Sequence, residues 1–323
     1  MNFVTSLGLI LLGLVIGQTV KKLVELKVIK ESFPIKRLIK LLQNIALLGL
    51  SPLVTLGAFW VVRLSDARLI ALPVLGVAAL IIGGIFSFFG ARLLKLDRKQ
   101  QGSMIVSGSF SNLGSFGSLI CYVLLGESSY AYVAMYRLFE HLVYHTIGFP
   151  VAKLHGDDFS SNEQNGGLKA LKKVLTDPYI IVSLLSIIIG SLLNISGLQR
   201  PAFYKNLNDI FIPTVSVILV TTVGFNMRLG AVNKYLRECI VVSVIKYVMV
   251  PVIIIGISYL LGLHTIEDGM VFKVIIILSA MPTAFNALVP PQIYGLDTDL
   301  ANSCWIFTTG VLVLFMPIFY LLV

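Results

Sequence analysis

Residues Ser107–Gly117 read SGSFSNLGSFG and interrupt an apolar run at residues 102–126. A second interruption, SAMPTAFN at Ser279–Asn286, lies in an apolar run at residues 269–294. Gly, Ser, Asn and Pro let a backbone leave helical geometry, which exposes its peptide groups. In lipid, such groups must face protein or a watery cavity. We therefore predict two helices that are broken near their middles and face each other.

The composition of the chain identifies the environment of these segments. Of its 323 residues, 57% are hydrophobic and 13% are charged, and the mean hydropathy is +0.91. These values exceed what a soluble surface tolerates. Apolar runs of about 20 residues, long enough to cross a hydrocarbon core of about 30 Å, recur along the chain. They predict an all-α membrane protein with one membrane domain (1–323) and ten transmembrane helices at residues 2–20, 38–62, 68–93, 102–126, 129–152, 178–197, 208–229, 236–262, 269–294 and 299–323.

The distribution of basic residues predicts the orientation in the membrane. Lys and Arg concentrate after the first, third, fifth and seventh spans and are sparse in the opposite loops. Because positive residues accumulate in short cytoplasmic loops, we expect a multi-pass protein of the cell membrane with both termini extracytoplasmic. The same bias accounts for the net charge of +9, so no nucleic-acid partner is implied. We expect no cofactor, no metal and no disulfide, since three cysteines lack paired spacing: Cys121, Cys239 and Cys304.

The two breaks occupy matching positions in two halves of the chain. A polar segment at residues 154–177 separates five spans (1–153) from five (178–323) and predicts a cytoplasmic linker. An odd number of spans per half forces the second half to insert upside down, as in an inverted repeat. The breaks lie about 170 residues apart, the offset that a repeat predicts. Close helix packing explains a single break more simply, but two matched breaks favour a site.

Matched breaks predict an anion site at the membrane midplane. Each break contributes the N-terminus of a half-helix, where unpaired N–H groups carry partial positive charge. Pro282 suits the first turn of one half-helix. Asn112 and Asn286 can donate to a carboxylate and accept from a hydroxyl. The candidate substrate-binding residues are Ser111, Asn112, Gly114, Ser115, Pro282, Thr283 and Asn286.

Four ionisable residues share one helical face in the fifth predicted span: Arg137, Glu140, His141 and His145. A charge at the bilayer centre costs about 2.5–3.5 kcal/mol on insertion scales, so these side chains should face the protein interior. One interpretation is a pair of Arg137 with Glu140 or His141 that ties helices together. The other is that Arg137 supplies positive charge near the substrate path. The histidines lack further ligands for a zinc ion.

Lys246, near the middle of the eighth span, is a second candidate cation. It either attracts a second substrate carboxylate or extends its ammonium group toward the membrane interface. Asn44 and Asn226 are secondary candidates for facing the site. Glu140 is the only carboxylate that we place deep in a span, and neither break carries an acidic residue, which disfavours sodium coupling. Proton coupling through the ionisable residues of the fifth span and simple uniport both stay open.

Four stretches carry a resemblance to a known family. AMPTAFNALVPPQIYG at residues 280–295 is followed by DTDLANS, and SFSNLGSFGSL lies at residues 109–119. GFNMRL lies at residues 224–229, and Lys246 stands five residues before Pro251. These stretches resemble patterns of the auxin efflux carrier family, which comprises the plant PIN proteins and their bacterial relatives and belongs to the bile acid/auxin transporter-like superfamily. The first stretch resembles the pattern of span 9, the second that of span 4, the third that of span 7 and the fourth that of span 8. The likeness covers the whole chain in length and span order.

The resemblance implies two inverted five-helix repeats in which spans 4 and 9 are broken and cross at the midplane. It also implies a scaffold of spans 1, 2, 6 and 7, a transport domain of spans 3–5 and 8–10, homodimers, and elevator-like movement. Compact bacterial members are associated with malate or malonate, and the plant branch with indole acetate. The chain departs from the family pattern in having no proline at the fourth-span break and no long cytoplasmic loop.

Three classes of function predict different patterns in such a chain. A secondary transporter predicts two matched midplane breaks, a channel predicts a repeated filter or rings of one charge, and an enzyme predicts a nucleophile with its base or a metal set. The breaks favour a transporter of small organic anions and not an enzyme. Two candidate cations, Arg137 and Lys246, favour a malate-like dicarboxylate, as in a malate permease. The alternatives are an auxin-like aromatic monocarboxylate, sodium-coupled symport of the bile-acid type, and a channel or sensor.

Overall fold

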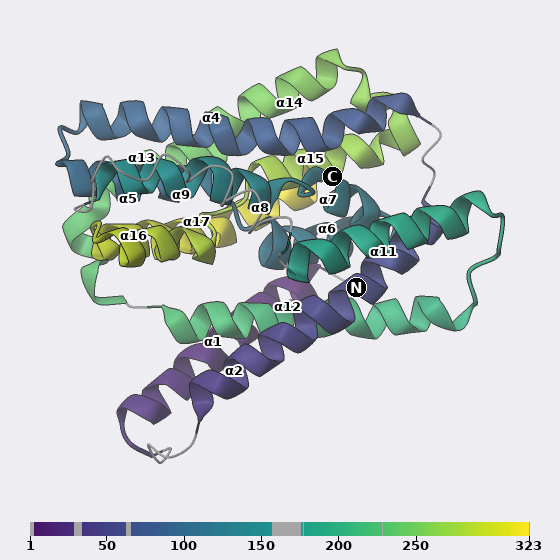
Figure 1. The fold of residues 1–323 in the computed structure, drawn as a ribbon, viewed down its shortest axis with the longest axis horizontal. Coiled ribbons are helices and arrows are strands. Elements are labelled where there is room, and N and C mark those ends of the chain that lie inside the picture. Colours follow the sequence, from purple (N-terminus) through teal and green to yellow (C-terminus); the bar gives the residue numbers. More distant parts are fainter. Residues whose placement is uncertain are drawn as a thin grey trace. The chain divides into compact units, whose positions relative to one another are not determined.

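The computed structural model describes residues 3–28, 34–62, 66–156, 176, 178–227 and 229–322. In these ranges the regular structure is helical, and the β-type pairing is limited to an isolated bridge between Ser111 and Thr283 (Figure 1). The prediction of an all-α chain is therefore confirmed. Most of the predicted linker at 154–177 lies outside the described residues.

Within the part of the chain that the structure describes, five of the predicted spans are continuous helices long and apolar enough to cross a membrane. Helix α1 (Phe3–Glu25) and helix α11 (Pro178–Ile195) lie at the first and sixth predicted spans. The fourth, fifth and ninth predicted spans are divided into shorter helices, and for the fifth this differs from the continuous helix that the sequence predicts. The five continuous spans are Arg37–Val61, Ala67–Leu93, Phe203–Asn226, Val232–Leu260 and Thr298–Leu322.

The first of two compact units comprises Met1–Ser65, Gly114–Ala134 and Asp177–Met227. Helix α1 packs along α12 (Phe203–Asn226) with closely spaced backbones, because a Cβ atom at Gly17 would lie 2.2 Å from the carbonyl oxygen of Thr221. Small residues let membrane helices approach in this way. The unit also contains α11 and most or all of the following elements: α2 (Ile35–Asn44), η1 (Ile45–Leu50), α3 (Ser51–Val61), α6 (Ser118–Leu125) and α7 (Ser129–Tyr136).

A polar network within the first unit joins the loop after α6 to helix α12. Glu127 forms an ion pair with Arg200 and accepts a hydrogen bond of 2.8 Å from the side-chain amide of Asn208. The hydroxyl of Tyr122 donates to a carboxylate oxygen of Asp209 at 2.8 Å. These bonds fix the end of α6 against the first turns of α12.

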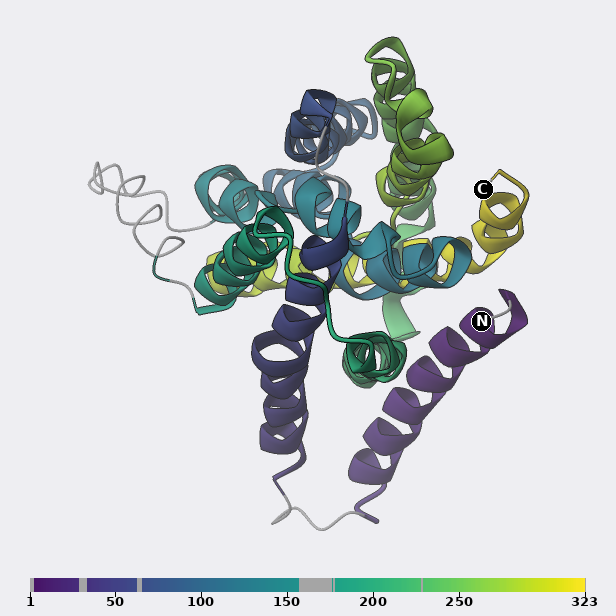
Figure 2. The same cartoon turned by 90° about the vertical axis from the view of Figure 1, so that its right-hand side faces the viewer.

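The second compact unit comprises Asp66–Leu113, Met135–Thr176 and Arg228–Val323. Helix α4 packs along α5, and helices α14 and α15 pack against each other (Figure 2). The unit contains η2 (Ala67–Ile70), α4 (Ala71–Leu93), α5 (Arg98–Ser109), α8 (Glu140–Val143), η4 (Tyr144–Gly148), α9 (Phe149–His155), η5 (Leu229–Tyr235), α13 (Leu236–Val244), η6 (Ile245–Met249), α14 (Val250–Leu260), η7 (Leu263–Gly269), α15 (Met270–Ser279), η8 (Phe285–Leu288), α16 (Val289–Tyr294) and α17 (Thr298–Leu322).

Three wide, π-helical turns each end two residues before a proline. The turn η1 precedes Pro52, η4 precedes Pro150, and η6 precedes Pro251. Proline has no backbone N–H, and its ring clashes with the carbonyl four residues earlier, so the helix widens there instead of continuing. This explains part of the division of the fifth predicted span, and it places Lys246 within a widened turn of the eighth.

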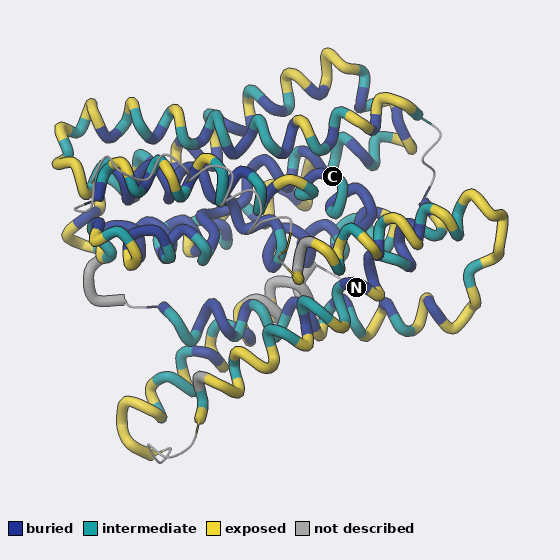
Figure 3. Tube along the Cα trace, viewed as in Figure 1, coloured by how far each residue is buried: buried dark blue, intermediate teal, exposed yellow. Residues whose placement is uncertain are grey.

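Large apolar side chains are exposed along several helices of both units. Examples are Leu12 and Val15 of α1, Leu185 and Ile188 of α11, and Leu314 of α17. Figure 3 shows exposed positions recurring along the helices, with buried positions between them. A helix whose exposed face is also apolar is suited to hydrocarbon and not to water.

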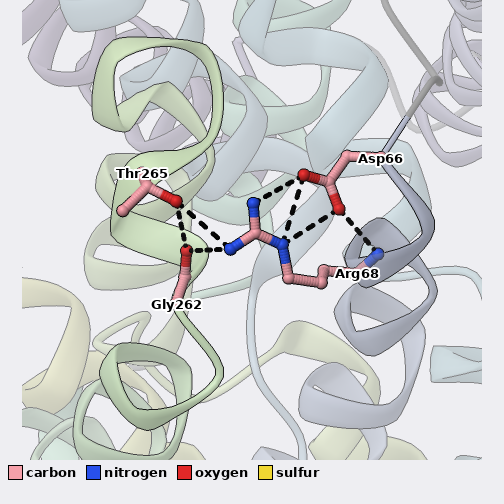
Figure 4. A network of polar contacts seen from close by, with 4 residues as sticks. All are labelled: Asp66, Arg68, Gly262 and Thr265. Atoms are coloured by element: carbon pink, nitrogen blue, oxygen red, sulfur yellow. Dashed lines mark hydrogen bonds and ion pairs between the residues drawn. The ribbon is translucent and has the colours of Figure 1, made fainter.

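Arg68 ties the start of α4 to the segment that follows α14 (Figure 4). Its guanidinium donates to the carbonyl of Gly262 at 2.9 Å, to the hydroxyl of Thr265 at 3.2 Å and to the carboxylate of Asp66 at 2.6 Å. The Arg68 side chain and its backbone N–H hold the pKa of the Asp66 carboxyl below its usual value. Because that pKa is lowered in the folded chain, the contact is complete above the ordinary carboxyl pKa. It is lost as the pH falls through the lower value.

We expect Arg68→Ala to increase hydrogen exchange in the segment 262–265, since that segment loses both of its bonds to the guanidinium. The measurement is the protection factor of these amides by mass spectrometry. Lys273→Ala, in α15, is the matched control and should leave the protection factors unchanged. Acidifying the native protein through the lowered Asp66 pKa should also reduce them. Equal protection in the Arg68→Ala and Lys273→Ala variants would contradict the assignment.

Candidate functional site

The two predicted breaks begin where α5 and α15 end. Helix α5 ends at Ser109, and Phe110 takes an extended conformation with φ −77° and ψ 125°. Helical turns resume at η3 (Leu113–Gly117), which leads into α6. Helix α15 ends at Ser279, and helical turns resume only at η8. Each break is therefore a short extended segment between helices.

The extended segments of the two breaks pair with each other. Ser111 and Thr283 form an antiparallel bridge. The N–H of Asn112 donates to the carbonyl of Pro282 at 2.8 Å, and a second bond of 3.0 Å runs from the N–H of Ala284 to the first break. Peptide groups that lipid cannot satisfy are thus satisfied by the opposite break.

Thr283 anchors the second break to two helices. Its hydroxyl donates to the carbonyl of Ser107 in α5 at 2.8 Å, and its N–H donates to the hydroxyl of Thr308 in α17 at 3.2 Å. The expectation that Pro282 begins a half-helix is wrong, because Pro282 lies in the extended segment with its carbonyl bonded to the first break. A proline begins the following helix instead, at Pro290 in α16.

Lys246 donates hydrogen bonds to the end of α5 and to the start of the first break. Its side chain is 2% exposed, and its Nζ atom donates to the carbonyl of Phe110 at 2.9 Å and to the hydroxyl of Ser111 at 2.7 Å. The carbonyl of Ser109 lies 3.5 Å from the same nitrogen. The ammonium group points into the protein, so the interpretation that it extends to the membrane interface is wrong.

Glu140 connects the first break to Arg137. The Nε of Arg137 donates to one carboxylate oxygen of Glu140 at 2.9 Å, and the hydroxyl of Tyr144 donates to the other at 2.9 Å. The Tyr144 hydroxyl also accepts from the N–H of Ser111 at 3.1 Å and lies 3.0 Å from the Ser111 carbonyl. The predicted Arg137–Glu140 pair is present, and it reaches the break through Tyr144.

The four ionisable residues of the fifth span do not share one continuous helix, which corrects our expectation. Helix α7 ends at Tyr136, a turn covers residues 137–139, and helix α8 begins at Glu140. The helix is interrupted because the N–H of Glu140 donates to the carbonyl three residues earlier, at 3.0 Å, which closes a turn and not an α-helical step. Further along, the Nδ1 of His145 lies 3.0 Å from the carbonyl of His141, and its ring stacks on Phe149.

The remaining predicted substrate residues are distributed over both units. Asn112 is buried in the second unit, and Asn286 is partly exposed in η8 of the same unit. Gly114 is partly exposed and Ser115 is buried, and both belong to the first unit. The structure therefore brings Ser111, Asn112, Pro282 and Thr283 together in one unit.

Of the secondary candidates, Asn44 ends α2, and the side-chain amide of Asn226 donates to the carbonyl of Thr222 in its own helix at 2.8 Å. Both lie in the first unit. Tyr144 and Thr308 were missed in the sequence. The spacing of four residues from Glu140 to Tyr144 is the signal that could have identified the tyrosine. Thr308 is one polar residue in an apolar span, and no sequence signal distinguishes it.

Paired breaks in an apolar, helical chain are typical of membrane transporters. Residues 39–320 match the family described as membrane transport protein, and the chain belongs to this family. The predicted resemblance to the auxin efflux carriers is confirmed. The family and its relatives are transporters, so the predictions of a transporter and not an enzyme are confirmed at this level.

Three relatives come from prokaryotes. The chain is 21% identical over 250 residues, 77% of each chain, to an "Uncharacterized transporter" of Methanothermobacter thermautotrophicus. It is 26% identical over 241 residues, 73% of each chain, to an "Uncharacterized transporter" of Methanocaldococcus jannaschii. It is 23% identical over 207 residues to a "Putative malonate transporter" of Rhizobium meliloti, covering 63% of this chain and 61% of that one.

Proposed function

We propose that this membrane transporter is a secondary carrier of small organic anions that binds its substrate at the paired breaks. The observation that carries the proposal is the bridge between Ser111 and Thr283, flanked by an ionisable network in which Lys246 and Glu140 are buried and Arg137 is partly exposed. The network holds the cations of Lys246 and Arg137 and the carboxylate of Glu140. When all three groups are ionised they leave one net positive charge beside the breaks. Such a charge in a low-dielectric interior favours an anion.

Substrate contacts in this proposal come mainly from side chains, since the backbones of the two breaks are bonded to each other. The amides of Asn112 and Asn286 suit a carboxylate and a neighbouring hydroxyl. Asn286 is partly exposed in η8, which gives a solute access to it. The proposed substrate residues are Ser111, Asn112, Gly114, Ser115, Pro282, Thr283 and Asn286.

A malate-like dicarboxylate is the favoured substrate. The donors of Lys246 are bonded to the first break, so Lys246 and Arg137 favour two carboxylates over one through their charge, and the amides of Asn112 and Asn286 suit a hydroxyl. The name of the Rhizobium meliloti relative refers to malonate, which is also a dicarboxylate. A proton carried by Glu140, His141 or His145 and uniport without a coupled ion are both consistent with this proposal.

The proposed mechanism is alternating access of elevator type in a homodimer of the cell membrane, with both termini extracytoplasmic. It assumes ten helices in two inverted repeats (1–153 and 178–323), with spans 4 and 9 crossing. Spans 1, 2, 6 and 7 form the scaffold, and spans 3–5 and 8–10 form the transport domain. The two compact units match this division in part, because the first unit contains the four scaffold spans but also Gly114–Ala134, which belongs to spans 4 and 5.

Direct uptake into proteoliposomes tests the proposed substrate. We expect labelled malate to accumulate and labelled indole acetate not to, with empty liposomes as the control. Repeating the assay with and without a sodium gradient and a pH gradient identifies the coupled ion. Uptake of indole acetate in preference to malate would support the aromatic monocarboxylate alternative instead, and inactivity toward both would contradict the substrate assignment.

A further inference from the structure

The C-terminal end of α5 presents oxygen atoms that no N–H of its own helix satisfies, and one of them, the Phe110 carbonyl, also accepts the N–H of Ala284 at 3.0 Å. The carbonyls of the last turn of a helix have no partner within the helix, and they carry partial negative charge. Because Phe110 leaves helical geometry, the carbonyls of Ser109 and Phe110 and the hydroxyl of Ser111 face one point. In carriers with broken helices, carbonyls of this kind coordinate monovalent cations.

That point is occupied by the ammonium nitrogen of Lys246. The nitrogen lies 2.7 Å from the Ser111 hydroxyl, 2.9 Å from the Phe110 carbonyl and 3.5 Å from the Ser109 carbonyl. Three N–H donors of an ammonium group therefore meet three oxygen acceptors. Water has little access, because the side chain is 2% exposed.

The charges around Lys246 are those of the network already described. Among the residues that the structure describes, no carboxylate forms an ion pair with its ammonium group. Glu140 acts on it through space by its charge and is connected to it by hydrogen bonds through Tyr144 and Ser111, and Arg137 lies beyond Glu140. The direct partners of Lys246 are thus neutral oxygens, as they are for a metal cation bound at the end of a half-helix.

We propose that these three oxygens form a monovalent-cation site and that Lys246 is its built-in, tethered cation. The protonated ammonium group offsets the partial negative charge at the end of α5 and fills the space between the three oxygens, so the native protein has no room there for a cotransported sodium ion. Removing the side chain opens the site, and Na⁺ then binds to the same oxygens. This inference rests on the proposed function only in the experiment that measures uptake, and the measurements of Tm do not depend on it.

Two variants separate the charge of Lys246 from the volume that it fills. Lys246→Ala removes the charge and opens the space, whereas Lys246→Met removes the charge and keeps the space filled. We expect both purified variants to unfold at lower temperature than the native protein, because the end of α5 loses its cation. Replacing choline chloride by sodium chloride at equal ionic strength should reverse about half or more of the decrease in Tm of Lys246→Ala relative to the native protein. It should change neither Lys246→Met nor the control Lys273→Ala.

One further measurement keeps the proposal testable if Lys246→Ala folds poorly, and a second tests the set of ligands if it folds. Uptake by the native protein should be equal in sodium and choline media, and dependence on Na⁺ would overturn the proposal. Adding Ser111→Ala to Lys246→Ala should abolish the response of Tm to Na⁺, since one ligand is removed. Equal stabilisation of the Ala and Met variants by Na⁺, or none in Lys246→Ala, would also overturn it. The Tm measurements need no substrate, so they fail or succeed independently of the malate assignment.

Discussion

Replacing Tyr144 by phenylalanine is expected to destabilise the protein by about 1–3 kcal/mol and to reduce transport several-fold. The hydroxyl is the partner of the Ser111 N–H and of a Glu140 carboxylate oxygen, and all of these groups are buried. Hydrogen bonds between membrane helices contribute on average only about 0.6 kcal/mol, but here a carboxylate and a peptide N–H both lose a partner at once. The measurements are Tm in detergent and initial rates of uptake.

Tyr136→Phe is the matched control for this prediction. Tyr136 is buried to the same extent as Tyr144, in the same unit, and its hydroxyl has no hydrogen-bond partner among the described residues. Removing an unpartnered buried hydroxyl should leave Tm unchanged or raise it. If the two variants lost equal stability, the hydroxyl of Tyr144 would have no special role at the break.

Gly83→Ala is expected to have the second large effect, by displacing the end of α5. A Cβ atom at Gly83 would lie 2.3 Å from the carbonyl oxygen of Gly108, a backbone atom next to the first break. The hydroxyl of Ser109 also donates to the carbonyl of Leu80 at 2.9 Å, so α4 positions this end of α5 directly. Overpacking typically costs about 1–3 kcal/mol, and a backbone neighbour leaves little room to relax. We expect a lower Tm and strongly reduced uptake.

Gly256→Ala in α14 controls for the loss of a glycine in a helix. No atom lies within 4 Å of a Cβ built at Gly256, so the added methyl group meets no neighbour. Alanine is also the better helix former, which favours equal or higher stability. Native-like uptake by Gly83→Ala would mean that close packing of α4 on α5 does not set the geometry of the break.

The sequence predicts the breaks well because it encodes them locally. Runs of Gly, Ser and Asn at Ser107–Gly117 and a Pro at position 282 are incompatible with an uninterrupted apolar helix, whatever the tertiary structure. The Arg137–Glu140 pair is similarly local, since its partners are three residues apart. Such features need no knowledge of which segments lie side by side.

Features that depend on tertiary contacts were missed. The pairing of Ser111 with Thr283 fixes Pro282 in an extended segment, although proline alone suggests the start of a helix. The bond of Lys246 to the first break joins residues 135 positions apart, so the sequence suggested instead a substrate carboxylate or the membrane interface as the environment of its ammonium group. The division of the fifth span follows from a turn bond and a widened turn before Pro150, and neither changes the apolar pattern.

Uptake of labelled malate by Asn112→Ala plus Asn286→Ala tests the central claim most directly. Both amides are proposed to hold the substrate, and Asn226→Ala serves as the control, because that amide bonds within its own helix in the first unit. The account predicts that the double variant folds, retains a Tm close to that of the native protein and loses malate uptake, while Asn226→Ala transports normally. Unchanged uptake by the folded double variant would contradict binding at the paired breaks.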